Sequence, residues 1–167
     1  FRGPFEAIME MDEVDFFVSM RPGTRKALEK YGLMKMLEKA PNIYLRDSLA
    51  SYVETISLVN KCEAILTDSG SMQEEAAALH VPCLTARYVT DRPETVEAGS
   101  NMLVGLKKRE VMAGLGKVLG DRTFREMMRR VKSPYGEGDS SERIVKFTEK
   151  VLAKGNLFRF EKGIRKP

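Results

Sequence analysis

The sequence predicts an α/β domain in which a parallel sheet is covered by helices on both faces. Short apolar runs alternate with segments of helical periodicity, and the links between them are short, which is typical of repeated strand–helix–strand units. Several of the runs are apolar almost throughout, as strands covered on both sides must be. The length of 167 residues and the 43% hydrophobic content fit one globular domain with a real core.

The strands are expected where the apolar runs lie. They are Val14–Ser19, Asn42–Leu45, Ala64–Thr67, Val81–Thr85 and Asn101–Val104. Residues 1–11 have the pattern of a helix entered part-way through. Segment 49–62 carries an apolar stripe, and segment 71–79 is alanine-rich, opening with Ser71 and Glu74 at the spacing of a capping box. These elements predict a Rossmann-like architecture, which by itself does not define a reaction.

Two more helices are expected near the C-terminus. Segment 121–131 predicts one apolar face and an arginine face that points into solvent; the apolar residues are Phe124, Met127, Met128 and Val131, and the arginines are Arg122, Arg125 and Arg129. Asp139 and Glu142 are spaced to begin a last helix. Its inward-facing residues would be Ile144, Phe147, Thr148, Val151 and Leu152. We therefore expect a domain over residues 1–153, followed by a basic tail over residues 154–167.

Composition and charge exclude several classes of function. The net charge of +4 arises in residues 107–132 and 143–167. A nucleic-acid surface would place that charge on one face with interleaved aromatic residues, whereas the arginines of segment 121–131 point away from its apolar residues, as on a solvated helix face. No apolar run is long enough to span a bilayer. Cys62 and Cys83 lie in apolar segments and are expected to be reduced thiols of a cytoplasmic protein. With one histidine, a Cys/His zinc site is excluded, and the chain has no glycine-rich loop for ATP or NAD. No metal, cofactor, nucleic-acid partner or membrane partner is expected.

The chain begins at Phe1, without an initiator methionine. We interpret it as a processed chain or as a piece of a longer one. His80 is the only histidine and follows the predicted helix 71–79, directly before Val81 and Pro82. At that position we favour a structural role at the helix end over a catalytic one.

The segment after the third predicted strand has the properties of an anion site. Ligands of open α/β sheets bind beyond the carboxyl ends of the strands, where this stretch lies. Gly70 allows a close approach to the backbone, Ser69 and Ser71 add hydroxyl donors, and the first N–H groups of a helix are unpaired. Glu74 and Glu75 are expected in the first turn, where carboxylates suit the helix dipole. The stretch alone fits a well-capped helix as well as a phosphate site.

The loop after the fourth predicted strand is the second candidate. It runs through polar residues to Arg92 and Pro93, and a proline at this point suits the first position of a helix. Neighbouring strands would bring this loop next to Gly70, so Arg92 could direct its guanidinium at the same anion. An arginine in such a loop also fits a plain surface charge.

Four motifs carry a resemblance to a known family. They are Thr67-Asp68-Ser69-Gly70-Ser71-Met72-Gln73-Glu74-Glu75-Ala76, then Val81-Pro82-Cys83-Leu84, then Thr90-Asp91-Arg92-Pro93-Glu94-Thr95-Val96-Glu97-Ala98-Gly99 with Leu103-Val104-Gly105, and finally Ser133-Pro134-Tyr135-Gly136-Glu137-Gly138 with Ser141-Glu142-Arg143-Ile144. In order and spacing, over residues 5–152, they resemble the C-terminal domain of the non-hydrolysing UDP-N-acetylglucosamine 2-epimerases. That family has two Rossmann-like domains around a cleft, the glycosyltransferase-B arrangement.

The resemblance implies a function and roles for particular residues. Family members convert UDP-GlcNAc to UDP-ManNAc, a precursor of surface polysaccharides, by eliminating and re-adding UDP. Ser69, Gly70 and Ser71 would hold the diphosphate, Glu75 the ribose hydroxyls, and Arg92 would lie near the phosphates. The proton-transfer carboxylates belong to the N-terminal domain, so no catalytic residue is expected in this chain, and the isolated chain is expected to be an inactive half of an isomerase. The partners implied are UDP or a UDP-N-acetylhexosamine, the missing N-terminal domain and a second copy of the protein.

The sequence also departs from the family pattern. Arg21 stands where archaeal-type members have a histidine, Gly23 where they have an arginine, Thr55 where an aromatic is usual, and Ser71 where a second glycine is usual. Arg21 can neutralise a phosphate, but an arginine cannot exchange a proton near neutral pH. An inactive UDP-sugar-binding or regulatory protein of the same fold is therefore the alternative. A third reading, a sugar transferase of the glycosyltransferase-B class, is opposed by the residues around Glu74 and Arg92.

Overall fold

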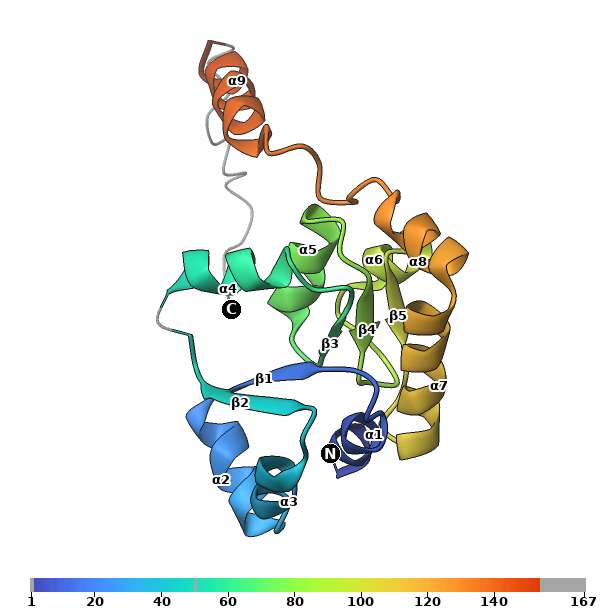
Figure 1. Ribbon diagram of the computed structural model, residues 1–167. Coiled ribbons are helices and arrows are strands. Elements are labelled where there is room, and N and C mark those ends of the chain that lie inside the picture. The colour runs from blue at the N-terminus through green and yellow to red at the C-terminus, as the bar shows by residue number, and fades with distance from the viewer. Residues whose placement is uncertain (1, 50, 154–167) are drawn as a thin grey trace, which may run out of the picture. The chain divides into compact units, whose positions relative to one another are not determined.

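The computed structural model describes residues 2–49 and 51–153 (Figure 1). The chain divides into two compact units, residues 1–134 and residues 135–167, and each is described by itself. The elements of the first unit are α1 (Arg2–Glu10), β1 (Phe16–Met20), α2 (Pro22–Lys30), α3 (Met34–Lys39), β2 (Ile43–Asp47), α4 (Tyr52–Val59), β3 (Ile65–Thr67), α5 (Gly70–Ala78), β4 (Cys83–Thr85), α6 (Pro93–Ala98), β5 (Asn101–Leu103), α7 (Lys108–Gly120) and α8 (Arg122–Arg129). The second unit contains α9 (Ser140–Ala153).

The strands pair in parallel, as predicted, but in two sheets. β1 pairs with β2, with Phe16 opposite Ile43, and the second sheet has the order β3-β4-β5, with Leu84 between Leu66 and Met102. Every strand expected from the apolar runs is present, with shifts of at most two residues at its ends. Within the described residues, no ladder joins β1 to β3. β3 has three residues, and its backbone pairing is with β4.

The central strand β4 separates an apolar layer from a polar one. Successive side chains of a strand point to opposite faces. Leu84 belongs to the buried apolar cluster with Val111 and Leu115 of α7. Thr85 points to the other face, where it donates a hydrogen bond to Asn101. Helices therefore cover both faces of this sheet, which confirms the predicted fold class.

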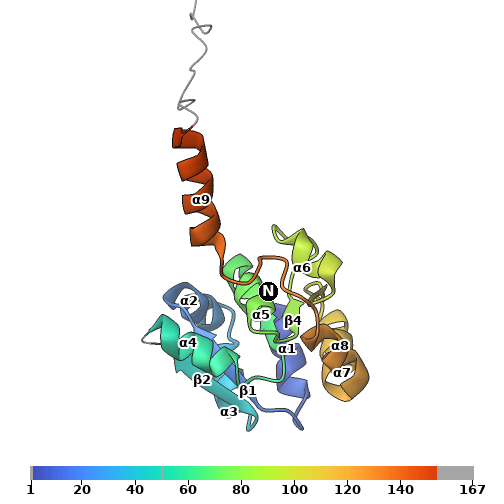
Figure 2. The same ribbon diagram turned by 90° about the horizontal axis from the view of Figure 1, so that it is seen from above.

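The apolar cluster extends from α7 to the first helix of the chain. Ala7 and Ile8 of α1 are buried in it, and α1 lies beside α7 in both views (Figures 1 and 2). Gly3 and the α7 entrance are so close that a Cβ atom at Gly3 would overlap the Leu106 carbonyl oxygen. Arg2–Glu10 thus form the helix that the sequence predicts in this part of the chain. None of the helices in the described part of the chain has the length and apolar character that crossing a membrane requires.

The arginine face predicted for α8 is partly wrong. Arg125 is largely buried and donates to the carbonyl oxygens of Val118 and Leu119 at the end of α7. Both Arg125 and Arg129 form ion pairs with Glu63. Because of these contacts, the two guanidinium groups lie against the protein and do not point into solvent. Met127, predicted to lie on the apolar face, is exposed.

The last predicted helix is present as α9. The helix begins at Ser140, after Asp139, as the capping residues predict, and the Asp139 carbonyl accepts from the Arg143 N–H. Within the unit of residues 135–167, α9 has no buried residue, and the inward face expected for Ile144, Phe147, Thr148, Val151 and Leu152 stays a prediction. The expectation for a basic tail over residues 154–167 falls outside the described residues.

Replacement by alanine is expected to have opposite effects on stability at two glycines of α7. A Cβ atom at Gly114 would overlap Val104 Cγ1 and lie 3.3 Å from Leu84 Cδ2, whereas one at Gly116 would meet nothing within 4 Å. We expect Gly116→Ala to raise the free energy of unfolding by about 0.5–1 kcal/mol through helix propensity. Gly114→Ala should lower it by about 1–3 kcal/mol through overpacking. Urea unfolding measures both, and Val104→Ala should rescue the Gly114 variant; equal effects at the two sites would contradict this packing.

Candidate functional site

The predicted anion-binding segment joins the end of β3 to the start of α5. α5 begins at Gly70, and Ser69 is the residue before it, in extended conformation. The Ser69 hydroxyl lies 3.1 Å from that of Ser71, the Ser69 N–H donates to Thr67 Oγ1, and no side chain caps the helix. The predicted capping box beginning at Ser71 is therefore wrong, because the helix begins earlier. The consequence is that both serine hydroxyls lie at the open N-terminal end of α5.

The two glutamates of α5 differ from the expectation in place and in surroundings. No acidic residue lies in the first turn of α5, so the prediction of a first-turn position for Glu74 and Glu75 is wrong. Glu74 accepts a hydrogen bond from Arg92 Nε. Glu75 is half-buried, and its removal from water, together with the neighbouring Glu74 carboxylate, raises its pKa. A hydroxyl group that donates to Glu75 would stabilise the ionised form.

The loop after β4 lies against this helix start, as the sequence predicts. Its first residue, Ala86, donates through its N–H to the Thr67 carbonyl oxygen at the end of β3, at 2.8 Å. Further along the loop, the Asp91 carboxylate comes so close that a Cβ atom at Gly70 would lie 3.1 Å from Asp91 Oδ2. Gly70 thus provides the close approach expected of it, and in this structure the group that approaches is a carboxylate of the protein itself.

Arg92 lies at the junction of this loop and α6. It precedes Pro93, which occupies the first turn of α6 as predicted. Besides Glu74, its guanidinium contacts Asp91, where Nη1 lies 2.9 Å from the carbonyl oxygen and 3.3 Å from Oδ2. About 30% of the Arg92 side chain is exposed. The guanidinium is therefore next to the start of α5, held by carboxylates and still accessible to a ligand.

A buried polar network behind these loops was not found from the sequence. Its centre is Gln73, fully buried on α5, whose Oε1 accepts from Thr90 Oγ1 at 2.6 Å and from Asn101 Nδ2 at 3.0 Å. Asn101 also donates to Thr95 Oγ1 and accepts from Thr85 Oγ1. Such residues are common on surfaces, and their partners lie 17 and 28 positions away, so local patterns carry no signal for them.

Arg21 and Thr55, the positions that depart from the family pattern, lie on other elements. Arg21 is exposed at the end of β1, directly before α2, and makes no capping hydrogen bond. In residues 2–49 and 51–153, no hydrogen bond or ion pair joins it to the start of α5. Thr55 lies on α4, where its hydroxyl donates to the Ser51 carbonyl oxygen. The structure thus brings Ser69, Gly70, Ser71 and Arg92 together, and leaves Arg21 without a direct contact to them.

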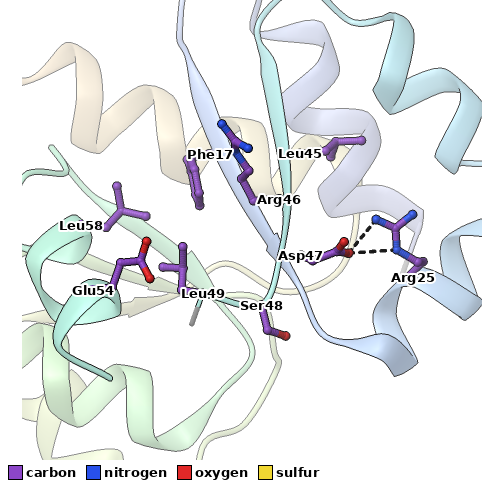
Figure 3. A pocket seen from close by; sticks show the side chains of 9 residues that line it. All are labelled: Phe17, Arg25, Leu45, Arg46, Asp47, Ser48, Leu49, Glu54 and Leu58. Carbon is purple, nitrogen blue, oxygen red and sulfur yellow. Dashed lines mark hydrogen bonds and ion pairs between the residues drawn. The ribbon is translucent and has the colours of Figure 1, made fainter. Parts of the chain in front are cut away.

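A pocket of about 720 Å³ lies between the β1–β2 sheet and α4 (Figure 3). On one side Asp47 accepts from Arg25 Nη2 at 2.6 Å, and on the other Phe17, Leu49 and Leu58 gather around an apolar wall. The remaining lining residues are Leu45, Arg46, Ser48 and Glu54. The pocket includes the carboxyl end of β2, an edge at which ligands of α/β folds bind. No site is predicted here from the sequence. Leu49 belongs to the apolar stripe expected over residues 49–62, and the two members of the Arg25–Asp47 pair lie 22 positions apart, so local patterns do not join them.

His80 has the structural role that the sequence favours. Its φ of 57° is left-handed, and it follows Leu79, the C-cap residue of α5. The Val81 N–H donates to the Ala76 carbonyl oxygen and the His80 N–H to that of Ala77, which is the Schellman pattern of a helix end. His80 Nδ1 lies 3.1 Å from the Val131 carbonyl oxygen.

Both cysteines are free. Cys83 lies on β4, and its burial raises the pKa of its thiol to about 12, so the group stays protonated near neutral pH. Cys62 is half-buried, and desolvation raises its pKa as well. Neither thiol is an activated nucleophile.

Comparisons with known proteins agree on one family. The family model described as UDP-N-acetylglucosamine 2-epimerase matches residues 2–149. The UDP-N-acetylglucosamine 2-epimerase of Methanocaldococcus jannaschii is 40% identical over 144 residues, which cover 86% of this chain and 37% of that protein. For the enzyme of the same name from Campylobacter jejuni, identity is 36% over 143 residues, or 86% of this chain and 35% of that protein. The chain therefore spans about a third of the length of the curated relatives it matches.

Solved structures show the same similarity. The M. jannaschii UDP-GlcNAc 2-epimerase in complex with UDP-GlcNAc and UDP superposes with a TM-score of 0.75 and 38% identity, over 89% of this chain and 39% of that one. The UDP-GlcNAc 2-epimerase of Neisseria meningitidis bound to UDP-GlcNAc superposes with a TM-score of 0.76 and 29% identity, over 89% and 41%.

Proposed function

The chain belongs to the UDP-N-acetylglucosamine 2-epimerase family, and on that premise we propose that it is the nucleotide-holding part of an enzyme that interconverts UDP-GlcNAc and UDP-ManNAc. Two similar proteins have been solved with UDP-GlcNAc bound, one of them also with UDP. Since the chain spans about a third of its relatives, we assign it the C-terminal domain. The complementary N-terminal domain would supply the proton-transfer carboxylates.

The observation that carries this proposal is the meeting of two loops at the start of α5. Gly70 lets another group approach the backbone closely, Ser69 and Ser71 present hydroxyls, and Arg92 adds a guanidinium from the neighbouring loop. We assign the diphosphate to these four residues, because unpaired N–H groups at a helix start and a nearby cation favour an anion. Glu75 would accept from the ribose hydroxyls, and Arg21 would approach the phosphates from the end of β1.

In the proposed reaction, this chain stabilises the leaving group. Elimination of UDP from the sugar places negative charge on the diphosphate, and positive charge held at that point lowers the barrier. Arg92 and the first N–H groups of α5 are suited to that role. No residue of this chain is assigned to proton transfer, so we expect the isolated chain to bind UDP without turnover. The full enzyme would work in the cytoplasm, since free thiols at Cys62 and Cys83 suit a reducing compartment, and it would form homodimers.

An NMR titration of the chain with UDP, up to millimolar concentration, tests the proposal. Shifts clustered at residues 68–75 and near Arg92 are expected. Uridine, which lacks the diphosphate, should leave Ser69, Gly70, Ser71 and Arg92 unshifted. Because uridine keeps the ribose, a shift at Glu75 under uridine agrees with its assigned role. A folded sample with no localised shifts under UDP would contradict the nucleotide site.

The second candidate function is that of a UDP-sugar-binding protein without turnover. Arg21 favours it, because it stands where archaeal-type members of the family have a histidine and an arginine does not exchange protons near neutral pH. Assaying the complete protein for conversion of UDP-GlcNAc to UDP-ManNAc separates the two. Conversion establishes the epimerase, and UDP binding without conversion establishes the binding protein.

A further inference from the structure

We propose that Gln73 and Thr90 are positioning residues that fix Arg92 for binding a nucleoside diphosphate. The inference rests on the proposed function, since it concerns the same anion site. Neither side chain would touch the ligand. They would act by holding the backbone of Arg92 in place.

The Gln73 side chain is held in a fixed position by its hydrogen bonds. Its side chain is fully buried, and its Nε2 donates to the Ser69 carbonyl oxygen at 3.3 Å. The same amide accepts, through Oε1, from Thr90 and Asn101. One side chain therefore ties the residue at the start of α5 to the loop after β4, and its remaining freedom is small because each of these partners belongs to a different element.

The Thr90 hydroxyl links Gln73 to the backbone of Arg92. A threonine hydroxyl has one proton to donate. Thr90 donates it to Gln73 Oε1 at 2.6 Å, so the oxygen is left as an acceptor, and it accepts from the Arg92 N–H at 3.1 Å. Two consecutive hydrogen bonds thus lead from the interior of α5 to the backbone of Arg92.

The carbonyl oxygen of Arg92 is held by the same network. Its carbonyl oxygen accepts from Thr95 Oγ1 at 2.8 Å and from the Thr95 N–H at 3.2 Å. Thr95 Oγ1 in turn accepts from Asn101, which contacts Gln73. Both polar groups of the Arg92 main chain are thus held by one network, while the guanidinium contacts the carboxylates of Glu74 and Asp91. A diphosphate that replaces these carboxylates would meet the guanidinium of a residue whose main chain is already ordered. Such preorganisation favours binding.

The test compares two substitutions at Thr90. Thr90→Val removes the hydroxyl and keeps the shape, whereas Thr90→Ser keeps the hydroxyl. We expect UDP affinity, measured by calorimetry on the full chain, to fall about tenfold in Thr90→Val and less than twofold in Thr90→Ser. In a double-mutant cycle, Thr90→Val should cause no further loss once Arg92→Ala is present. Unchanged affinity in Thr90→Val, or an equal loss in the Arg92→Ala background, would overturn the inference.

A second readout separates this inference from the proposed function. Exchange of the Arg92 amide hydrogen reports its bond to Thr90 without any ligand, and it should speed up in Thr90→Val but not in Thr90→Ser. If the wild-type chain does not bind UDP, the proposed function fails and the ligand part of the inference fails with it. If UDP binds and the Arg92 amide exchanges equally in all variants, the positioning role fails alone.

Discussion

Replacing Arg92 by alanine is expected to weaken UDP binding by about tenfold to a hundredfold. A hydrogen bond to a charged group contributes about 1.5–3 kcal/mol, which corresponds to that range. The substitution also leaves Glu74 and Asp91 beside the proposed diphosphate without the guanidinium that neutralises them. Repulsion from these two carboxylates adds to the loss. Isothermal titration calorimetry with UDP at constant ionic strength measures the effect.

Arg122→Ala is the matched control for this substitution. Arg122 is an exposed arginine at the start of α8, and its removal changes the net charge of the chain by the same amount. UDP affinity should stay within twofold of the wild type. Equal losses in both variants would mean that the chain binds UDP by general attraction, and an unaffected Arg92→Ala variant would remove Arg92 from the site.

Asn101→Ala is expected to lower the free energy of unfolding by about 2–4 kcal/mol. Asn101 is about 4% exposed and makes three side-chain hydrogen bonds, to Thr85, Gln73 and Thr95. Alanine leaves the buried Thr85 hydroxyl without its oxygen acceptor and opens a small cavity. Each buried polar group left unpaired costs about 1–3 kcal/mol. Urea unfolding monitored by circular dichroism measures the change.

Asn60→Ala serves as the control for the loss of an amide side chain. Asn60 is exposed at the end of α4, and we expect its substitution to change stability by less than about 0.5 kcal/mol. A loss below about 1 kcal/mol in Asn101→Ala would show that the polar face of β4 tolerates unpaired groups. The network would then contribute less to the fold than its burial indicates.

The sequence predicts the fold well because the fold depends on local patterns. Apolar runs of four to six residues locate all the observed strands, and the family motifs locate the two loops that meet at Gly70. The residue that precedes α5 is predicted two positions too late, at Ser71 in place of Ser69. Both positions hold a serine, and backbone geometry alone decides between them. Local patterns cannot decide such a case.

Contacts between distant segments are what sequence patterns cannot supply. Arg125 and Arg129 fit a solvent-facing stripe until Glu63, 66 positions before Arg129, is placed beside them. In the sequence, Gln73 is one residue of a motif, and nothing local indicates that it is buried. It can be buried because Asn101 of β5 and Thr90 of the loop after β4 form hydrogen bonds with it. Burial of polar groups is a property of the assembled layers, so the positioning role of Gln73 and Thr90 emerges from the structure.

The polar layer on β4 has a consequence for how this chain tolerates substitution. Gln73 presents one carbonyl oxygen to both Thr90 and Asn101, and Asn101 has one carbonyl oxygen for Thr85. A change at any one of these positions alters which donors and acceptors the others need. Their mutational effects are therefore non-additive, and in divergent relatives we expect these positions to vary together or not at all.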